Sequence, residues 1–474
     1  MRLFKKYLKY EGKATRFRAN FLVYFKNERK NFMFGFKFLG NTRIPHNKNT
    51  AEMKPVKMTP PKEVLLSMQQ HIGAPATPIV KVGDEVKVGQ LIAEPSGYVS
   101  SPVYSSVSGT VKKIDSHVLP NGSEVAAIRI ENDGLMTPYE GLTPPDVHNL
   151  TSLLDAIRNS GLVGLGGAGF PITVKIDAAK KGNVHTIVVN AAECEPYVTS
   201  DTRTMLDHSD SIFEVVSLIE KVAPTIQKIV FGIEGNKPEC IEKMNELFAG
   251  NEKVSVVALP TLYPQGSEEI IVYNTTGIVI PEGKLPTDVG VLVINVTSLE
   301  YIAYYCRTGM PLVQRTITVD GSAVKTPMNV IAPIGTSIRD IFEFVGVDTE
   351  EVGKVLLGGP MMGTAVYSLD EAVNKKTNII TAMNHKDAEE AKTTACIHCG
   401  RCVDYCPIGL NPTLFTKALT LGKDDKMALL ESASINLCME CGCCSYVCPA
   451  RRPLVQNNRL AKADFRAYKA KQSN

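Results

Sequence analysis

The sequence predicts a multidomain α/β protein. Its 474 residues exceed what one compact core usually organises, which suggests about three or four domains. In the middle of the chain, short β-branched runs such as residues 185–190 alternate with helical stretches such as residues 212–222, a pattern typical of a parallel sheet. Nine of the twelve cysteines lie between Cys396 and Cys448 and mark a separate C-terminal module. The segments that we expect are residues 1–33, 34–145, 146–305, 306–370 and 371–474.

Residues 1–33 form a basic extension. Residues 1–32 hold ten Lys and Arg against Glu11 and Glu28, a net charge of +8, so the rest of the chain is near −5 because the whole carries +3. The extension fits a disordered arm, a surface helix at a membrane, or residues upstream of a true initiator at Met33. It lacks the apolar core and cleavage site of a secretory signal. The mildly acidic body lacks a basic patch, so we expect no nucleic-acid partner.

Residues 34–145 contain short alternating strands around the pattern V-x-V-G-D-x-V-x-V-G-Q at residues 80–90. This region resembles the barrel-sandwich module of biotinyl and lipoyl carriers. A carrier needs a lysine at the tip of its hairpin, and residues 95–107 contain none. We therefore expect a structural docking module.

A glycine-rich loop opens the next segment, residues 146–305. Gly164, Gly166, Gly167 and Gly169 fall within six residues, directly before Phe170. Glycines at this density allow backbone N–H groups to approach a phosphate or a flavin without interference from Cβ atoms. An ordinary tight turn would use the same residues, and the order differs from the usual dinucleotide fingerprint.

Polar side chains follow the predicted strands of this segment. Asn190, Glu193 and Glu195 come after the run 185–190, and Asn295 lies near the end of the run 289–296. Open α/β sheets bind ligands at the carboxyl ends of their strands, so these side chains are candidate ligand contacts. For each glutamate the alternative is a surface or helix-capping carboxylate.

The cysteines form two runs of the pattern C-x2-C-x2-C-x3-C-P, which is typical of [4Fe–4S] clusters. In two-cluster proteins the fourth cysteine of each run binds the other cluster. We therefore assign one cluster to Cys396, Cys399, Cys402 and Cys448. The other cluster is assigned to Cys438, Cys441, Cys444 and Cys406. The alternative is zinc, which pairs of C-x2-C also bind. The remaining cysteines are expected to be spectators: Cys194, Cys240, Cys306 and Cys443.

The surroundings of the two runs predict a helical module over residues 371–474. Asn411 and Pro412 have the order of a helix cap followed by proline at the first helical position. Residues 426–431 suggest another helical turn. The basic residues after 450 fit either a docking surface for an acidic electron carrier or a solvated helix face.

Upstream, residues 316–365 suggest a small β-grasp domain with Ile338, Ile341 and Phe342 as the apolar stripe of its helix.

Four motifs and the doubled cysteine runs, in this order, resemble the RnfC family of Rnf-type electron transport complexes. The motifs are G-x-G-G-A-G-F-P-x-x-x-K from Gly164, N-x-x-E-x-E-P from Asn190, G-x-E-E from Gly266 and N-V at Asn295. The core of that family is similar to the flavin- and NADH-binding subunit of respiratory complex I. The resemblance covers residues 34 to 450 and implies a Rossmann-like FMN/NADH domain and an SLBB-like β-grasp domain.

The resemblance also implies roles for individual residues. Gly164, Gly166 and Gly167 would approach FMN, with Lys175 on its phosphate and Phe170 stacked on a ring. Asn190 and Asn295 would bind the polar edges of the flavin. Glu195 would contact the nicotinamide half of NAD(H), with Glu193 beside it, and Glu268 and Glu269 would hold the adenosine hydroxyls. Ala192, Ile176 and Ala178 depart from the complex I pattern, which bears on NADH affinity more than on the flavin site.

The implied function is electron exchange between NAD(H), FMN and two [4Fe–4S] clusters in an ion-translocating ferredoxin:NAD+ oxidoreductase. The implied partners are the other proteins of a membrane complex and ferredoxin or a ferredoxin-like subunit. No apolar run approaches the ~18 residues of a membrane span, so any membrane association must come through partners or a surface contact. The resemblance implies a peripheral subunit on the cytoplasmic face of the bacterial inner membrane. The alternatives are a flavoprotein similar to cobalamin reductases and an iron–sulfur relay subunit that binds neither flavin nor nucleotide.

Overall fold

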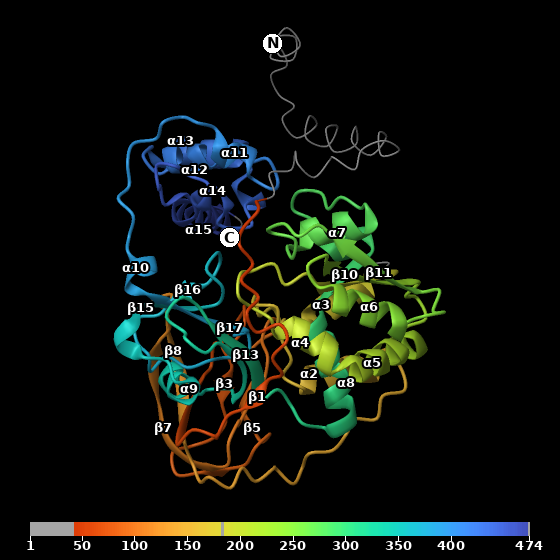
Figure 1. The fold of residues 1–474 in the computed structure, drawn as a ribbon. Coiled ribbons are helices and arrows are strands. Elements are labelled where there is room, and N and C mark those ends of the chain that lie inside the picture. The colour runs from red at the N-terminus through yellow and green to blue at the C-terminus, as the bar shows by residue number, and fades with distance from the viewer. Residues whose placement is uncertain (1–41, 182–183, 473–474) are drawn as a thin grey trace.

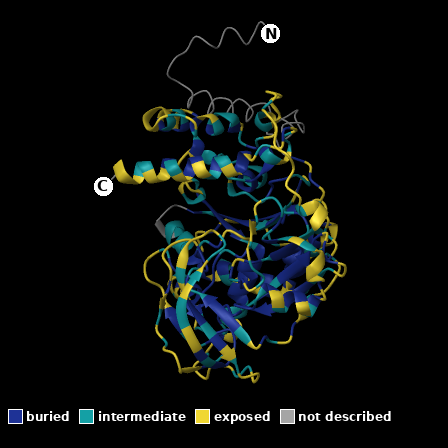
Figure 2. Ribbon diagram, turned by 90° about the vertical axis from the view of Figure 1, so that its left-hand side faces the viewer, coloured by how far each residue is buried: buried dark blue, intermediate teal, exposed yellow. Residues whose placement is uncertain are grey.

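The computed structural model describes residues 42–181 and 184–472. The predicted basic extension and Met33 lie outside these residues. Four sheets and a C-terminal group of helices make up the greater part of the described chain (Figure 1). Within it, no helix is both long enough and apolar enough to cross a membrane. Figure 2 shows that buried residues concentrate in the part that contains the sheets, whereas exposed residues are frequent along the C-terminal helices.

Two small sheets form the first domain. One has the strand order β2-β8-β7-β4 and the other β3-β5-β6. The strands are β2 (Glu63–Ser67), β3 (Thr77–Pro78), β4 (Glu85–Val86), β5 (Leu91–Glu94), β6 (Val103–Tyr104), β7 (Gly109–Val118) and β8 (Glu124–Asn132). Val64, Leu66, Ile128 and Ile130 lie at every second position of their strands and fill the core, as period-two patterning requires.

A parallel four-stranded sheet with the order β11-β10-β9-β12 forms the second domain. Its strands are β9 (Thr186–Ala191), β10 (Lys228–Glu234), β11 (Val254–Leu259) and β12 (Val291–Asn295). Its helices are α2 (Leu150–Asn159), α3 (Ile172–Lys181), α4 (Ser200–Asp207), α5 (Ser209–Val222), α6 (Pro238–Leu247), α7 (Glu268–Thr276) and α8 (Val296–Thr308). The predicted strands and helices are confirmed to within a few residues.

Helices cover both faces of this parallel sheet. Apolar residues of α5 and α8 pack on one face, and α7 packs on the other through Ile271 and Val272. Gly232 in β10 permits the close approach of α7, because a Cβ there would lie 3.0 Å from side-chain atoms of Ile271 and Thr275. Strands β9 and β12 are neighbours, so their carboxyl ends place Asn190 beside Asn295 in register.

The third domain is a mixed six-stranded sheet with the order β1-β14-β13-β17-β15-β16. Its strands are β1 (Val56–Lys57), β13 (Gln314–Asp320), β14 (Met328–Pro333), β15 (Val352–Leu357), β16 (Thr364–Ala365) and β17 (Ile379–Asn384). Helix α9 (Ile338–Val345) packs on it through Ile338, Ile341 and Phe342, which confirms the predicted stripe.

Two strands of this sheet lie outside the segment expected for it, residues 306–370. Strand β17 lies between β13 and β15, so this domain extends past residue 370 into the segment assigned to the cysteine module. Strand β1 belongs to the same sheet, although its residues fall within 34–145. Strands pair with the strands that lie beside them in the folded domain, whatever their order in the chain. The polar residues around β17 made this short buried strand difficult to recognise in the sequence.

We call residues 42–58 the strap. In Figure 1 it runs from beside the C-terminal helices down to β1. Thr42 exchanges two backbone hydrogen bonds of 2.9 Å with Tyr263, and the carbonyl of Thr50 accepts from the Asn329 side chain at 3.0 Å. The strap therefore ties the second domain to the third.

The C-terminal domain is helical. Its main helices are α12 (Pro412–Ala418), α13 (Lys423–Ser432) and α15 (Leu454–Gln472), and its short helices are α11 (Arg401–Asp404) and α14 (Cys443–Tyr446). Leu410, Phe415, Leu430 and Phe465 form its core. The predicted cap is confirmed, because the Asn411 side chain accepts a hydrogen bond from the backbone of Thr413 at the start of α12.

Candidate functional site

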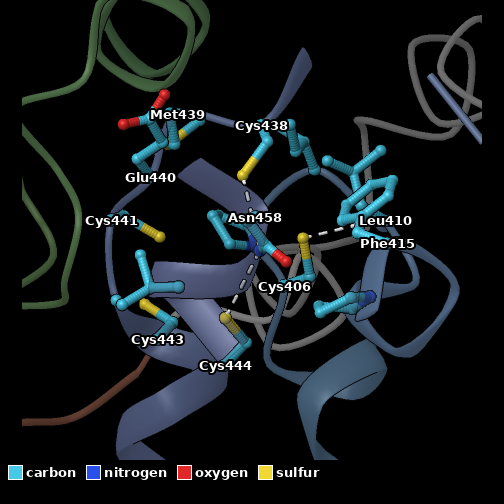
Figure 3. A pocket seen from close by; sticks show the side chains of 15 residues that line it. Cys406, Leu410, Phe415, Cys438, Met439, Glu440, Cys441, Cys443, Cys444 and Asn458 are labelled. Carbon is cyan, nitrogen blue, oxygen red and sulfur yellow. Dashed lines mark hydrogen bonds between the residues drawn. The ribbon is translucent and has the colours of Figure 1, made fainter. Parts of the chain in front are cut away.

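Two groups of four cysteines each line a cavity in the C-terminal domain. The first, called the outer group, is Cys396, Cys399, Cys402 and Cys448. The second, called the inner group, is Cys406, Cys438, Cys441 and Cys444 (Figure 3). In each group, one cysteine comes from the other run. The structure thus brings together the two sets that the spacing predicts, and Cys443, which was expected to be a spectator, also lines the inner cavity (Figure 3).

The inner group is buried and has polar neighbours. Cys438, Cys441 and Cys444 are each only 8% exposed. The Asn458 amide on α15 donates to the sulfurs of Cys438 and Cys444 at 3.6 and 3.8 Å, and the backbone N–H of Leu410 donates to Cys406 Sγ at 3.2 Å. Burial raises the pKa of Cys406 to about 11 and that of Cys444 to about 12. Metal binding would therefore have to displace these thiol protons.

The outer group lies at the surface. Cys399 is exposed and its neighbour Ile397 is 66% exposed. Four thiols are the number and type of donors that a [4Fe–4S] cluster takes. Within the described residues, no three His, Cys, Asp or Glu side chains are arranged to hold a single metal ion.

Several basic residues of the last helix are engaged within the domain. Lys462 donates to the carbonyl of Cys438 and lies 3.3 Å from Glu440, and Arg459 lies 3.4 Å from Glu440. Part of the predicted basic surface therefore stabilises the loop around the inner group.

The glycine-rich loop lies at the carboxyl end of the parallel sheet. Its ends are closed by a 2.8 Å hydrogen bond from Gly164 to the carbonyl of Phe170, while Gly166 and Gly167 are exposed. Gly167 has a φ of +106°, which favours glycine, and a Cβ on Gly166 would lie 3.1 Å from the Asn295 amide. The loop thus offers open backbone beside Asn295, a cradle that fits a flavin or a phosphate.

The two asparagines of the strand ends have defined partners. Asn190 donates to the carbonyl of Gly266 at 2.8 Å. Asn295 caps α8 and donates to Asp201 at 2.7 Å. Burial, and next the charge of Glu193, raise the pKa of Asp201 to about 6. No motif in the sequence marked Asp201 as a member of this cluster.

Glu193 has a capping role in the structure. Its carboxylate accepts hydrogen bonds from the backbone of Asp201 at 2.6 Å and from the backbone and hydroxyl of Thr202 at 3.3 and 2.6 Å. These groups form the amino terminus of α4, where a carboxylate is favourable. The contacts of Glu193 in the structure are therefore those of a helix-capping carboxylate, which was the alternative to a ligand contact.

Lys175 and the two glutamates of α7 lie together. The Lys175 ammonium forms an ion pair with Glu268 and is 3.5 Å from the carbonyl of Val293. Glu269 follows at the amino terminus of α7, and burial raises its pKa. Phe170 is half-buried at the end of the glycine loop. The structure therefore joins residues from separate predicted motifs at one edge of the sheet.

Glu195 faces the inner cysteine group. Its carboxylate accepts from the backbone of Met361 at 3.1 Å and from the Tyr263 hydroxyl at 3.5 Å. That hydroxyl also donates to the carbonyl of Cys441 at 2.8 Å. Burial raises the pKa of Glu195 to about 7, against the opposing effect of the Met361 hydrogen bond. Tyr263 is fully buried, so it links the acidic loop directly to the cysteine domain.

Sequence reasoning missed Lys48, Tyr263 and Met361. Tyr263 lies three residues before the G-x-E-E motif, but nothing marked its ring as an interdomain contact. The loop that contains Met361 is a turn closed by a 2.8 Å hydrogen bond from Gly363 to the carbonyl of Gly359. Lys48 comes from a segment without any motif, and its contacts span about 150 residues of sequence.

The α/β domain with its glycine loop, joined to two four-thiol sites, defines a protein of the iron–sulfur electron-transfer class. Three family descriptions match the chain. They are the RnfC barrel sandwich hybrid domain over residues 36–135, the Nuo51 FMN-binding domain over residues 157–304 and the 4Fe-4S dicluster domain over residues 379–452. The chain belongs to the RnfC family, which supplies one component of ion-translocating ferredoxin:NAD+ oxidoreductase complexes.

Curated relatives support this membership across most of the chain. The RnfC-type component of the proton-translocating ferredoxin:NAD+ oxidoreductase complex of Clostridium ljungdahlii is 41% identical over 82% of this chain and 85% of its own length. The Na+-translocating counterpart of Acetobacterium woodii is 38% identical over 92% of this chain and 98% of its own length. Among solved structures, an NAD+-reducing [NiFe]-hydrogenase in its H2-reduced state aligns with a TM-score of 0.47 and 16% identity over 68% of this chain and 61% of that one, too weak a likeness to carry an argument.

The matching domains imply FMN and two [4Fe–4S] clusters as cofactors. The first domain is the barrel-sandwich hybrid, the second the FMN-binding domain and the last the dicluster domain. The exposed glycine backbone fits FMN, and the two sets of four thiols fit the clusters.

Proposed function

We propose that this chain exchanges electrons between NAD(H), FMN and two [4Fe–4S] clusters within an ion-translocating ferredoxin:NAD+ oxidoreductase. FMN, when bound, accepts or donates a two-electron hydride on one side and single electrons on the other. The chain's own residues bind and orient the cofactors and exclude water from the path between them.

The observation that carries this proposal is the contact between the acidic loop and the inner cysteine group. Tyr263 touches both Glu195 and the backbone of Cys441 without exposure to solvent. The loop after β9, where open α/β sheets bind ligands, is therefore one side chain away from a cluster site. This arrangement suits the passage of electrons and would be unnecessary in two independent domains.

The same contact suggests an order for the redox centres. The inner group is buried against the FMN-binding domain, and the outer group reaches the surface. We infer that the inner group would hold the cluster nearer the flavin site, and the outer group the cluster nearer the partner, so that bound clusters would relay single electrons in this order. By analogy with its relatives, that partner is ferredoxin or another redox protein of the complex.

We assign individual residues to the cofactors as follows. The inner and outer groups each bind one cluster through four thiolates. The residues assigned to FMN are Gly164, Gly166, Gly167, Phe170, Lys175, Asn190 and Asn295. Those assigned to NAD(H) are Glu195, Glu268 and Glu269, because carboxylates accept hydrogen bonds from ribose hydroxyls. The ion pair between Lys175 and Glu268 would have to open when the FMN phosphate binds Lys175.

The finer domain assignments are also part of the proposal. We interpret the third domain, with α9 packed across its mixed sheet, as an SLBB-like β-grasp domain that extends through β17. Association with the cytoplasmic face of the inner membrane would come through the other proteins of the complex.

An anaerobic spectrum tests the proposal. The purified, reconstituted protein is assayed for iron, sulfide and flavin, and its absorbance is recorded before and after NADH. We expect about eight irons and one FMN per chain, with both chromophores bleached by NADH. A protein with the iron and flavin but no response to NADH would contradict the nucleotide assignment.

One observation favours a second function, an iron–sulfur relay that uses neither flavin nor nucleotide. The carboxylates of Glu193 and Glu195 are both held by hydrogen bonds within the chain. In the same experiment, a full complement of iron without flavin under gentle purification would support the relay.

A further inference from the structure

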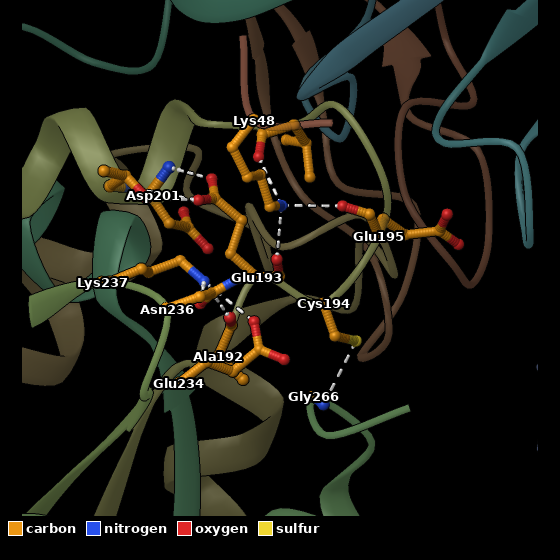
Figure 4. Close-up of polar contacts among 12 residues, drawn as sticks. Lys48, Ala192, Glu193, Cys194, Glu195, Asp201, Glu234, Asn236, Lys237 and Gly266 are labelled. Atoms are coloured by element: carbon orange, nitrogen blue, oxygen red, sulfur yellow. Dashed lines mark hydrogen bonds and ion pairs between the residues drawn. The ribbon is translucent and has the colours of Figure 1, made fainter. Parts of the chain in front are cut away.

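Lys48 of the strap reaches into the acidic loop after β9. Its ammonium donates hydrogen bonds to the backbone carbonyls of Glu193, Glu195 and Val198 at 2.7, 2.8 and 2.7 Å (Figure 4). An ammonium group has three N–H donors, so all three are used. Lys48 therefore determines where three carbonyls of a six-residue loop point.

Two residues of this loop have unfavourable backbone conformations, which contacts such as those of Lys48 can stabilise. Glu193 and Tyr197 both have positive φ angles, of 49° and 71°, which residues other than glycine rarely adopt. Residues in such conformations persist only where their surroundings hold them, and they concentrate at functional sites. The three carbonyls that face Lys48 lie on or close to these two residues. The lysine is thus placed to stabilise this conformation over alternatives.

Lys48 is half-buried, and all three N–H donors of its ammonium group are used within the chain. Burial lowers the pKa of Lys48 to about 8, and the charge of Glu193 opposes that effect. Carbonyl dipoles and a nearby carboxylate compensate for the lost hydration, as a buried charge requires. A lysine that served only solubility would lie at the surface, as Lys54 of the same strap does.

Several residues of the strap form hydrogen bonds with residues around the candidate nucleotide site. The carbonyl of His46 accepts from the backbone of Tyr197 at 2.8 Å, and Thr50 shares a hydrogen bond with Thr199. Thr42 pairs with Tyr263, whose hydroxyl contacts the Glu195 carboxylate. Lys48 lies between these residues in the strap and makes the charged contact with the loop.

We propose that Lys48 is a positioning residue for the nucleotide site, which sets the backbone of residues 193–198 so that Glu195 is presented to NAD(H). Nothing in the motif pattern assigns this residue, and it lies 145 residues before the start of the loop it positions. This inference rests on the proposed function, because it concerns the site at which the nicotinamide would bind.

The test compares Lys48→Gln with Lys48→Met and with Lys54→Met as the matched control. Glutamine is neutral and offers two donors, so it retains part of the carbonyl contacts if the methionine variant fails to fold. Steady-state reduction of an artificial electron acceptor gives KM for NADH and kcat separately. Hydrogen exchange of residues 193–198, followed by mass spectrometry, reports the loop without any turnover.

We expect Lys48→Gln to raise KM for NADH about tenfold, because small misplacements of a positioning group have effects of this order or larger. We expect kcat, the cluster spectra and the FMN content to stay within about twofold. Exchange of the loop amides should become faster. Lys54→Met should match the wild type in every measurement.

Two results would overturn the inference. One is faster loop exchange with an unchanged KM, which would make Lys48 purely structural. The other is an equal loss of kcat, FMN and cluster absorbance, which would indicate general unfolding. The wild type separates this inference from the proposed function: if it fails to oxidise NADH, the proposed function fails before any variant is compared.

Discussion

The two cysteine runs have almost the same backbone but different surroundings. His398 and Glu440, at equivalent positions, have φ angles of 55° and 57°, and the glycines that follow, Gly400 and Gly442, have φ angles of 79° and 81°. A Cβ on Gly442 would lie 2.9 Å from the carbonyl of Met361 in another domain, whereas the nearest atom for Gly400 is 3.9 Å away, on Asp404. The runs are thus two copies of one local structure, and at these glycines the second is packed against the third domain, which contains Met361, whereas the first is not.

This difference indicates how two cluster sites with the same local structure can have a fixed order in electron transfer. The inner group receives side-chain hydrogen bonds from Asn458 and a nearby ammonium from Lys462, and the outer group reaches solvent. Cluster potential responds to net charge, hydrogen bonds to the sulfurs and solvent exposure. Equal ligand sets can therefore differ in potential and in access to a partner.

The largest predicted effect comes from breaking the crossed ligation. Cys448→Ser should abolish the outer cluster, and Cys406→Ser the inner one, because each supplies the fourth thiolate to the other run's cluster. Iron should fall from about eight to about four per chain in each variant. Loss of the inner cluster in Cys448→Ser would contradict the crossed assignment.

A matched control for these variants is Cys443→Ser. Cys443 is buried, and its thiol lies 3.9 Å from the carbonyl of Tyr263. We expect this variant to retain both clusters, since Cys443 falls outside the repeated spacing.

Chelation should distinguish the two groups next. The outer cysteines are more exposed, so an iron chelator added under anaerobic conditions should remove the outer cluster on the order of tenfold faster, because an exposed loop opens at lower free energy. The two rates can be measured separately in Cys406→Ser and Cys448→Ser, each of which retains one cluster. Equal rates in the two variants would mean that burial does not protect the inner cluster.

Replacement of Asn458 by leucine should shift the potential of the inner cluster alone. Loss of two N–H donors to sulfur disfavours the more negative reduced cluster, so its potential should fall by on the order of 50 mV, the equivalent of about 1 kcal/mol for one electron. An EPR redox titration in the Cys448→Ser background measures it. An unchanged potential would show that these hydrogen bonds have no influence.

The smallest expected effect is that of Tyr263→Phe. Its hydroxyl reaches the inner group only through the carbonyl of Cys441, so the shift in potential should be smaller than for Asn458→Leu but of the same sign. Tyr301→Phe is the control, because the Tyr301 hydroxyl donates to the carbonyl of Pro311 instead. A larger shift for Tyr263→Phe than for Asn458→Leu would assign the main control of potential to the interdomain contact.

Several elements followed from the sequence because their cause is local. The cap at Asn411, the strands that end near Asn190 and Asn295, and the apolar stripe of α9 all depend on residues a few positions apart. The domain boundaries were less predictable. Strands β1 and β17 join a sheet whose other strands lie far along the chain, and pairing over such distances leaves no periodic trace in a short segment.

The role of the glutamates shows the same limit within the site. Glu193 and Glu195 are two residues apart in one motif, yet one caps α4 and the other faces Tyr263 and Met361. Their spacing favoured a shared function, whereas the left-handed conformation at Glu193 turns them to different partners.

The sequence by itself determined the cysteine spacing, the glycine loop and the strand ends, because each is set by residue types within a short window. Only the tertiary structure decided that one cysteine group is more deeply buried than the other, and that Lys48 contacts the acidic loop. Those properties arise from contacts between segments far apart in the chain, such as Lys48 with Glu195 and Tyr263 with Cys441. Burial and long-range hydrogen bonding depend on how whole domains pack, and no local pattern records that.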